Sequence, residues 1–272
     1  AARARREANP EPEPESARFG SRCPVCLEEW DMNVRSTIVL CCCRRICSSC
    51  AEKTGYGSCP VCRAPSPKSD AESLALLRRH VENDVPEAVT FLGNVYRIGD
   101  CGVVKSTKKA AKIYKRAVEL GDAEAASRLA VLYAAGDGVK LDKNKALQLW
   151  RTAADRGYAH AQAKLAEFLE DNGSPHEETF RLLELAAKQR ITQAEYNVGE
   201  RYVTGRGVTQ DLEEAKRWFA RAAAKGHDKA VSALEQISAV ERGEMRHPRS
   251  HDEGRYQRLR AQRRLARRHG PP

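Results

Sequence analysis

The sequence has no long apolar run. No stretch approaches the roughly 20 consecutive apolar residues of a membrane-spanning helix, so we expect no transmembrane segment. The first residues, AARARREANPEPEPES, lack the apolar segment of a secretory signal. The chain begins with Ala1 rather than Met, which leaves open a processed product or a fragment whose missing start carried a targeting signal. Cysteine usage is therefore the better guide to location.

Catalytic groupings are also missing from the C-terminal part. Four histidines stand singly, without partner residues at catalytic spacing, and are typical of surface positions: His80, His160, His176 and His227. Cys101 is alone in an expected turn, where we interpret it as an ordinary thiol. We therefore name no catalytic residue.

Positive charge is unevenly distributed along the chain. The net charge is +10, but ten arginines and three acidic residues from Arg242 onward give a surplus of seven, which leaves +3 for the rest. The basic balance thus belongs mostly to the tail and does not predict a basic groove across the folded part. The tail segment RYQRLRAQRRLARRHG could form a basic helix with Leu259 and Leu265. Nucleic-acid binding is therefore a third and weakest functional hypothesis, beside a disordered terminus or a localisation signal.

Composition divides the chain into five segments. The start is rich in Arg, Glu and Pro and offers nothing to bury, a short linker contains two prolines, and the long segment that follows has helical periodicity. We predict a disordered segment at 1–20, a cysteine-rich module at 21–64, a linker at 65–71, helical repeats at 72–240 and a basic, disordered tail at 241–272.

An internal repeat is the clearest organisational signal. Ala88, Ala125, Ala161, Ala194 and Ala230 recur in one frame, at spacings of 37, 36, 33 and 36 residues. Each unit predicts a first helix with a Leu or Val followed by a small residue, which lets two helices approach closely. A glycine-containing turn comes next, and then a second helix with an aromatic residue or Leu three residues before an Ala. Arg190 replaces the glycine that ends the other second helices, so we expect a less regular turn there.

These features resemble the Sel-one-like repeat, a relative of the tetratricopeptide repeat, over about residues 72–238. The resemblance implies four helical hairpins between two half-unit caps, because a solenoid must cover its ends. It also implies an extended surface that binds a protein substrate or adaptor.

Nine of the ten cysteines lie within residues 23–62, in three Cys-x-x-Cys pairs and one run of three. Two residues between sulfurs let a tight turn aim both thiolates at one ion, and tetrahedral zinc takes four such ligands. Disulfides are the alternative, but nothing marks the chain as secreted. A redox role for a CPVC pair would require a single pair that opens a helix in a βαβ setting. We therefore expect two structural zinc ions and a reducing cytoplasmic or nuclear location.

The arrangement resembles an all-cysteine RING finger. By that resemblance the first and third pairs share one ion, and the second and fourth share the other. The implied ligands are Cys23, Cys26, Cys47 and Cys50 at site one, and Cys41, Cys42, Cys59 and Cys62 at site two. Cys41 with Cys43 is the main competitor for the triplet, and the usual RING histidine is missing. The expected fold class is therefore mainly α: a small zinc-stabilised RING-like module followed by a helical hairpin repeat solenoid.

The same resemblance implies a ubiquitin ligase that acts without a covalent intermediate. Val25 and Pro60 would contact a ubiquitin-conjugating enzyme, and Arg63 would bridge that enzyme and ubiquitin. Val25 could equally pack the small core, and Arg63 could be a solvated charge. Only eight residues separate Cys50 from Cys59, which leaves little room for the helix that commonly lines the partner groove. The alternative is a non-catalytic zinc-binding scaffold for protein interactions, and no membrane partner is expected.

Overall fold

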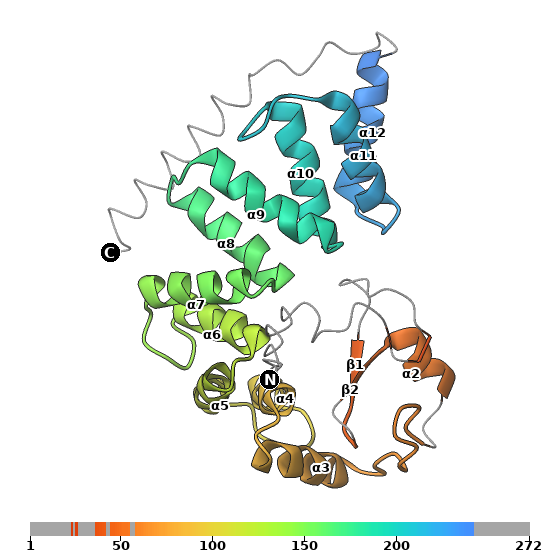
Figure 1. Ribbon diagram of the computed structural model, residues 1–272, viewed down its shortest axis with the longest axis vertical. Coiled ribbons are helices and arrows are strands. Elements are labelled where there is room, and N and C mark those ends of the chain that lie inside the picture. Colours follow the sequence, from red (N-terminus) through yellow and green to blue (C-terminus); the bar gives the residue numbers. More distant parts are fainter. Residues whose placement is uncertain (1–22, 24, 27–35, 42–43, 55–57, 242–272) are drawn as a thin grey trace, which may run out of the picture. The chain divides into compact units, whose positions relative to one another are not determined.

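The first regular elements lie between the cysteine pairs. Strand β1 (Ser36–Val39) pairs antiparallel with β2 (Arg44–Cys47), and helix α2 (Ser48–Thr54) follows at once (Figure 1). The register places Ser36 opposite Cys47, so the strands separate Cys41, which follows β1, from Cys47 at the far end of β2. The computed structural model describes residues 23, 25–26, 36–41, 44–54 and 58–241.

Ten helices make up the described part of the chain after residue 69. They are α3 (Asp70–Glu82), α4 (Pro86–Ile98), α5 (Thr107–Glu119), α6 (Ala123–Ala135), α7 (Lys143–Asp155), α8 (Ala159–Asp171), α9 (His176–Lys188), α10 (Thr192–Thr204), α11 (Leu212–Ala223) and α12 (Asp228–Glu241). Hairpins pair each first helix (α4, α6, α8 and α10) with the second helix that follows it. The predicted helical repeat solenoid is thus confirmed. Among the described helices, none has the length and apolar character needed to cross a membrane.

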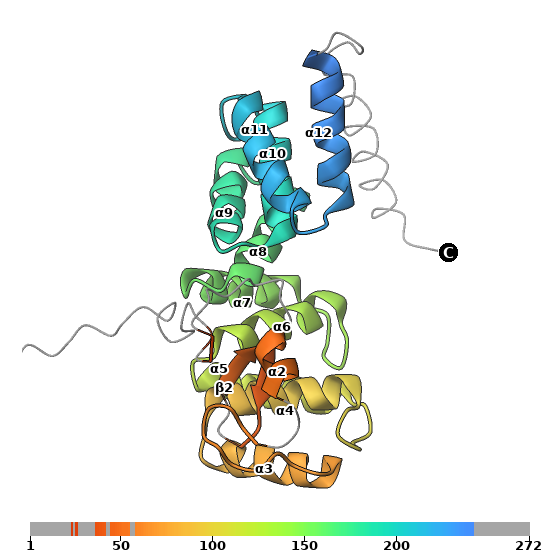
Figure 2. The same cartoon turned by 90° about the vertical axis from the view of Figure 1, so that its right-hand side faces the viewer.

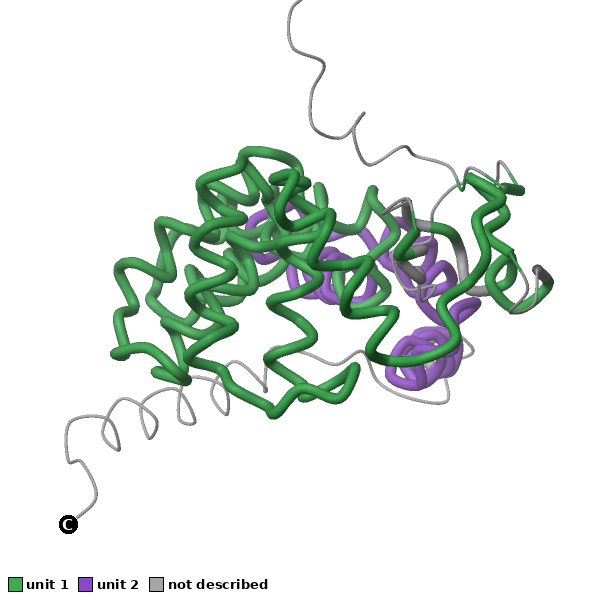
Figure 3. Tube along the Cα trace, turned by 90° about the horizontal axis from the view of Figure 1, so that it is seen from below, with its two compact units in different colours: residues 1–194 green, residues 195–272 purple. Residues whose placement is uncertain are grey.

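Two compact units divide the chain, with the boundary inside α10 (Figure 3). The unit of residues 1–194 contains the cysteine-rich elements, α3 and three complete hairpins. Its main core is a continuous cluster that extends from Leu77 to Leu169. The unit of residues 195–272 has a separate core around Phe219, to which Ala215, Ala222 and Ala230 contribute.

Helix starts and ends follow local chemistry. Ser106, Asp142 and Asp211 each precede a second helix, and their side chains accept a hydrogen bond from a backbone N–H of its first turn. Gly99 and Gly136 end the first helices α4 and α6 with left-handed backbone, where φ is 81° and 71°. The predicted glycine turns therefore close these hairpins.

The turn at Arg190 is as regular as the glycine turns, so the expectation of a less regular turn was wrong. Arg190 adopts φ of 67°, and its N–H donates to the Ala187 carbonyl oxygen at 2.9 Å. The N–H of Gly157 makes the same bond to Ala154, also at 2.9 Å. The turn that ends α9 thus places an arginine in left-handed backbone, at a cost of roughly 1–2 kcal/mol relative to glycine.

Close helix approach explains the small residue at the middle of each first helix. A methyl group placed on Gly93 would lie 2.4 Å from Cε1 of Tyr114, whose side chain is fully buried. A methyl group on Gly199 would lie 2.6 Å from Cε1 of Phe219 in the same way. In these two hairpins the ring of the second helix therefore leaves room only for glycine on the first helix.

We expect Gly93→Ala to destabilise the protein by about 1–3 kcal/mol, because overpacking against Tyr114 outweighs the gain of about 1 kcal/mol in helix propensity. The third hairpin combines Ala166 with Leu183 at the same two positions. In a Tyr114→Leu background, the added methyl group should therefore cost nothing. Urea unfolding of the four proteins of this double-mutant cycle measures the coupling, and a cost that is equal in both backgrounds would contradict the packing explanation.

Candidate metal centre and the helical repeats

One group of thiols combines the first and third cysteine pairs. The sulfur atoms of Cys23, Cys26 and Cys50 lie within 4.8 Å of one another. Cys50 is in the first turn of α2, and it forms a small core with Cys23 and Ile46, all three buried. The tight turn after Cys23 and the start of α2 thus aim three sulfurs at one point.

A second group combines the triplet with the last pair. The sulfur atoms of Cys41, Cys59 and Cys62 also lie within 4.8 Å of one another, and those of Cys41 and Cys62 are 3.3 Å apart. That separation exceeds a disulfide bond length of about 2.05 Å, and no disulfide joins the described cysteines. This grouping, like the first, is the one that the RING resemblance implies.

The Cys59 thiol ionises more readily than an ordinary cysteine, because its pKa is lowered. Burial raises its pKa, but the backbone N–H groups of Cys62 and Val61 donate to its sulfur at 3.3 Å and help lower the pKa to about 7. The thiolate is the form that binds metal. Both groups consist only of thiols, which suits zinc, and each provides three of four tetrahedral ligands among the described side chains.

Two of the implied zinc ligands cannot be placed. Cys42, together with its competitor Cys43, lies outside the described residues, and for Cys47 the structure describes the backbone at the end of β2 but not the side chain. The choice within the triplet therefore remains a prediction, although Cys41 belongs to the second group under either pairing.

The implied partner contacts lie beside the two groups. Val25 is half-buried and packs against the small core of Cys23, Ile46 and Cys50, which agrees with the alternative that it packs the core. Pro60 is half-buried, while Arg63 is exposed in a tight turn with φ of 62°. Helix α2 starts at Ser48, within the third cysteine pair. The helix therefore begins before the short span and includes Cys50, and only its last four residues, 51–54, lie after that cysteine.

The repeats offer a second kind of site on their first helices. In α4, α6 and α8, residues spaced three to four apart form one face of the helix and remain at least partly exposed. We call this row the first-helix face: Phe91, Asn94, Ile98, Arg128, Val131, Lys164 and Glu167. Ile98 and Val131 are 54% and 45% exposed, although both are large and apolar. The row also contains charged side chains. Arg128 forms an ion pair with buried Glu124 at 2.7 Å, and Lys164 forms one with Glu167 at 2.7 Å.

Sel1 repeats match residues 86–122, 123–158, 159–190 and 192–227, which together make up more than half of the chain. The chain belongs to the Sel1 repeat family. The matched hairpins are those of the structure, from α4 to α11. The match begins after the cysteine-rich segment.

Curated relatives share the Sel1 part. "Chitin synthase regulator SKT5" of Malassezia restricta is 28% identical over 177 residues, which are 61% of this chain and 12% of that protein. The protein of the same name from Saccharomyces cerevisiae is 27% identical, over 56% of this chain and 23% of its own length. "DAP3-binding cell death enhancer 1" of Rattus norvegicus is 30% identical, over 37% and 20%. The chain thus spans less than a quarter of these relatives.

A solved structure shares the Sel1 fold. The crystal structure of a Sel1 repeat protein from Oxalobacter formigenes has a TM-score of 0.54 and 26% identity to this chain. The likeness covers 60% of this chain and 68% of that one.

The Sel1 hairpins also contain a buried acid that the sequence analysis did not single out. Asp122 caps α6 by accepting the Ala125 N–H at 2.6 Å and is 7% exposed. Its pKa is raised to about 7: burial is the main cause, the hydrogen bond from Ala125 opposes it, and the neighbouring carboxylate of Glu124 adds to it. An aspartate directly before a helix is a recognisable cap in sequence, but its burial depends on the tertiary structure.

We expect Asp122 to make stability fall as pH rises. Its pKa in the folded chain is above the ordinary value, so folding retains the proton from about pH 4 to about pH 7, and this contribution is lost as pH rises through that window. The loss amounts to at most about 4 kcal/mol. Asp122→Asn keeps the cap and should flatten the pH dependence of urea unfolding. An Asn variant with the pH profile of the wild type would refute this role.

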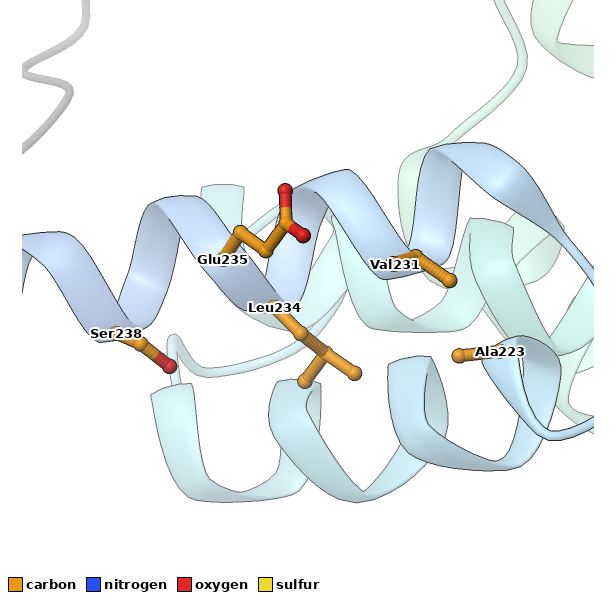
Figure 4. A pocket seen from close by; sticks show the side chains of 5 residues that line it. All are labelled: Ala223, Val231, Leu234, Glu235 and Ser238. Atoms are coloured by element: carbon orange, nitrogen blue, oxygen red, sulfur yellow. The ribbon is translucent and has the colours of Figure 1, made fainter.

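A shallow hollow of about 330 Å³ lies between α11 and α12 (Figure 4). Apolar side chains line most of it, and its polar groups are those of Glu235 and Ser238. This arrangement brings together no pair of groups that could perform chemistry.

Proposed function

We propose that this chain is a non-catalytic adaptor whose Sel1 repeats bind a protein partner on the first-helix face. The observation that carries the proposal is the exposure of Ile98 on α4 and Val131 on α6, in a row that also presents the charged side chains of Arg128, Lys164 and Glu167. An apolar centre with a polar rim is the usual anatomy of a protein interface. Solenoids of helical hairpins provide such surfaces in general.

The relatives favour the adaptor over an enzyme. Their printed names describe regulation or binding, as in chitin synthase regulator and DAP3-binding cell death enhancer. Because this chain covers only a small part of each, the shared part is best regarded as the interaction portion. The partner itself is open.

The test replaces Val131 of the full chain with a photoreactive amino acid, which crosslinks a protein bound at that position. The captured protein is then purified and titrated against the wild type and Val131→Glu. We expect Val131→Glu to weaken binding about tenfold or more, because it places a charge at the centre of the interface. Leu185→Glu is the matched control, because Leu185 is 38% exposed on the second helix α9. Equal affinity of the wild type and both variants would refute the proposal.

Zinc binding by the two thiol groups is the second part of the proposal. The two sulfur groups, which consist only of cysteine thiols, support one structural ion held by Cys23, Cys26, Cys47 and Cys50, and another held by Cys41, Cys59, Cys62 and one more thiol of the triplet. The ions would fix the fold of the module rather than take part in a reaction.

A RING-type ubiquitin ligase is the second candidate function. The sulfur groupings favour it because they match the order of pairs in a RING finger. Discharge of ubiquitin from a panel of charged conjugating enzymes by the zinc-loaded chain is the test. A ligase should stimulate discharge, and Arg63→Ala should abolish the stimulation. Val25→Ala is a less specific variant, because Val25 also packs the core. If the chain with two bound zinc ions did not stimulate ubiquitin discharge, the ligase proposal would be refuted and the adaptor proposal would remain.

A further inference from the structure

The twelve lysines from residue 105 to residue 225 fall into two classes. Four form ion pairs within 3.0 Å of a glutamate, namely Lys164, Lys188, Lys216 and Lys225. Eight others, all exposed, make no ion pair with a described residue. They occupy the second helices α5 and α7 and the loops before them, and we call them the lysine edge: Lys105, Lys108, Lys109, Lys112, Lys115, Lys140, Lys143 and Lys145.

Contacts between the two hairpins make these lysines one surface. The loop between α6 and α7 rests on the start of α5, because a methyl group on Gly138 would lie 2.5 Å from the carbonyl carbon of Thr107. Farther along, the ammonium groups of Lys115 and Lys145 lie over the same ring, that of Tyr133, at 5.9 and 5.0 Å from its centre. The lysines of α5 and α7 are therefore neighbours.

Two apolar residues protrude from the same edge. Val104 is 85% exposed in the loop between α4 and α5, and Leu141 is 55% exposed in the corresponding loop between α6 and α7. Val103 and Val139 in the same loops pack against the core, which anchors each loop. Figure 2 shows that both loops project from the same side of the hairpins. Their exposed tips thus point away from the protein together.

Acidic residues on these elements do not neutralise the edge. Asp142 accepts the Lys145 backbone N–H as a helix cap, and Asp100 accepts the Cys101 N–H. Asp137 in the second loop, Glu119 at the end of α5 and Asp155 at the end of α7 complete the acidic residues at the edge. Eight lysines therefore stand against five carboxylates, and none of these carboxylates forms an ion pair with a lysine of the edge among the described residues.

We propose that the lysine edge binds the surface of a membrane that contains anionic lipids, with Val104 and Leu141 entering the headgroup region. Lysines attract such a surface by diffuse electrostatics, and protruding apolar side chains add the contact that a lipid interface accepts. A peptide partner would bind an apolar groove more favourably than the protruding side chains of Val104 and Leu141. Tyr96 and Tyr133 lie beneath Lys109 and Lys145, where their rings cannot stack on nucleic-acid bases. Peripheral binding of this kind needs no membrane-spanning helix.

The test is co-sedimentation of the full chain with phosphatidylcholine vesicles, with and without phosphatidylserine. We expect binding only to the vesicles with phosphatidylserine, and weaker binding at higher salt. Each edge lysine should contribute about fivefold, so the triple variant Lys108→Gln, Lys112→Gln and Lys143→Gln should bind about a hundredfold more weakly. The matched control removes the ion-paired lysines instead, in Lys164→Gln, Lys188→Gln and Lys216→Gln. Both variants keep the basic tail and lose the same charge.

A second variant separates membranes from acidic polymers. Val104→Ser with Leu141→Ser should weaken vesicle binding while leaving its salt dependence unchanged, because the substitutions remove insertion and no charge. Full binding by this variant would mean that the edge attracts acidic polymers such as RNA, and it would overturn the proposal. Equal loss in the two lysine triples would also overturn it, because the tail and overall charge would then account for the binding. Circular dichroism checks that each variant remains folded.

Discussion

Removal of zinc is expected to unfold residues 23–62 and to spare the Sel1 repeats. A segment of about 40 residues buries too little apolar surface to fold alone, whereas a structural zinc site contributes on the order of 10–16 kcal/mol of apparent binding energy. The main core of the first unit lies almost entirely in the helices from Leu77 onward and needs no metal. Hydrogen exchange followed by mass spectrometry, before and after chelation, resolves the two parts.

Two cysteine variants control for this result. Cys50→Ser removes a member of the first thiol group and should lower the zinc content to one ion per chain, with faster exchange around α2. Cys101→Ser changes a cysteine in the loop between α4 and α5 and should leave two ions bound. Unchanged exchange of residues 23–62 after complete zinc removal would show that the module folds without metal. The adaptor proposal for the repeats would be unaffected.

The hairpins were predictable because their signals are local and periodic. Alanines in a fixed frame mark where helices touch, and Ala88, Ala125 and Ala161 are indeed fully buried. The need for a small residue at Gly93 is also visible in sequence, because a glycine or alanine recurs at this position of each first helix, whereas the close contact with Tyr114 comes from the structure. Arg190 was misjudged for the opposite reason. Its left-handed backbone belongs to the hydrogen-bonded turn that ends α9, and this turn overrides the preference of the residue.

The cysteine pairs were predictable only as sets. Their spacing indicates turns that aim two sulfurs together, and the sulfur groups of the structure join the pairs in the order that the resemblance implies. The strands β1 and β2, which separate Cys41 from Cys47, carry no strong signal in a segment this short. Helix α2 was missed because its start lies inside a cysteine pair.

Net charge concealed the lysine edge. The chain before the tail carries only +3, which argued against a basic surface on the folded part. The structure segregates the charges: the edge gathers eight lysines without ion pairs, while acidic residues elsewhere pair with their own helix neighbours, as Glu184 does with Lys188. A small net charge over a long segment therefore says little about any one face.

Glu195 is the charged residue whose position the sequence conceals most. It follows Ala194 in the repeat frame, where the other hairpins carry Val89, Ala126 and Gln162, so the position is a core position. Its carboxylate is fully buried and accepts from Arg221 at 2.9 and 3.1 Å, while the Lys225 ammonium lies 2.9 Å from its other oxygen. One buried acid thus joins two cations of the following second helix and turn.

We expect Glu195→Ala to destabilise the second unit by about 3–5 kcal/mol, because it leaves the Lys225 ammonium, only 14% exposed, without its carboxylate. Hydrogen exchange of residues 195–241 and urea unfolding measure the loss. Glu213→Ala is the matched control, since it breaks the Lys216 ion pair of an acid that is 74% exposed and should cost no more than about 1 kcal/mol. Similar losses in the two variants would show that the buried carboxylate is no more important than a surface one. A large loss for Glu195→Ala alone would show that a charge at a core position is tolerated because two cations of the same unit converge on it.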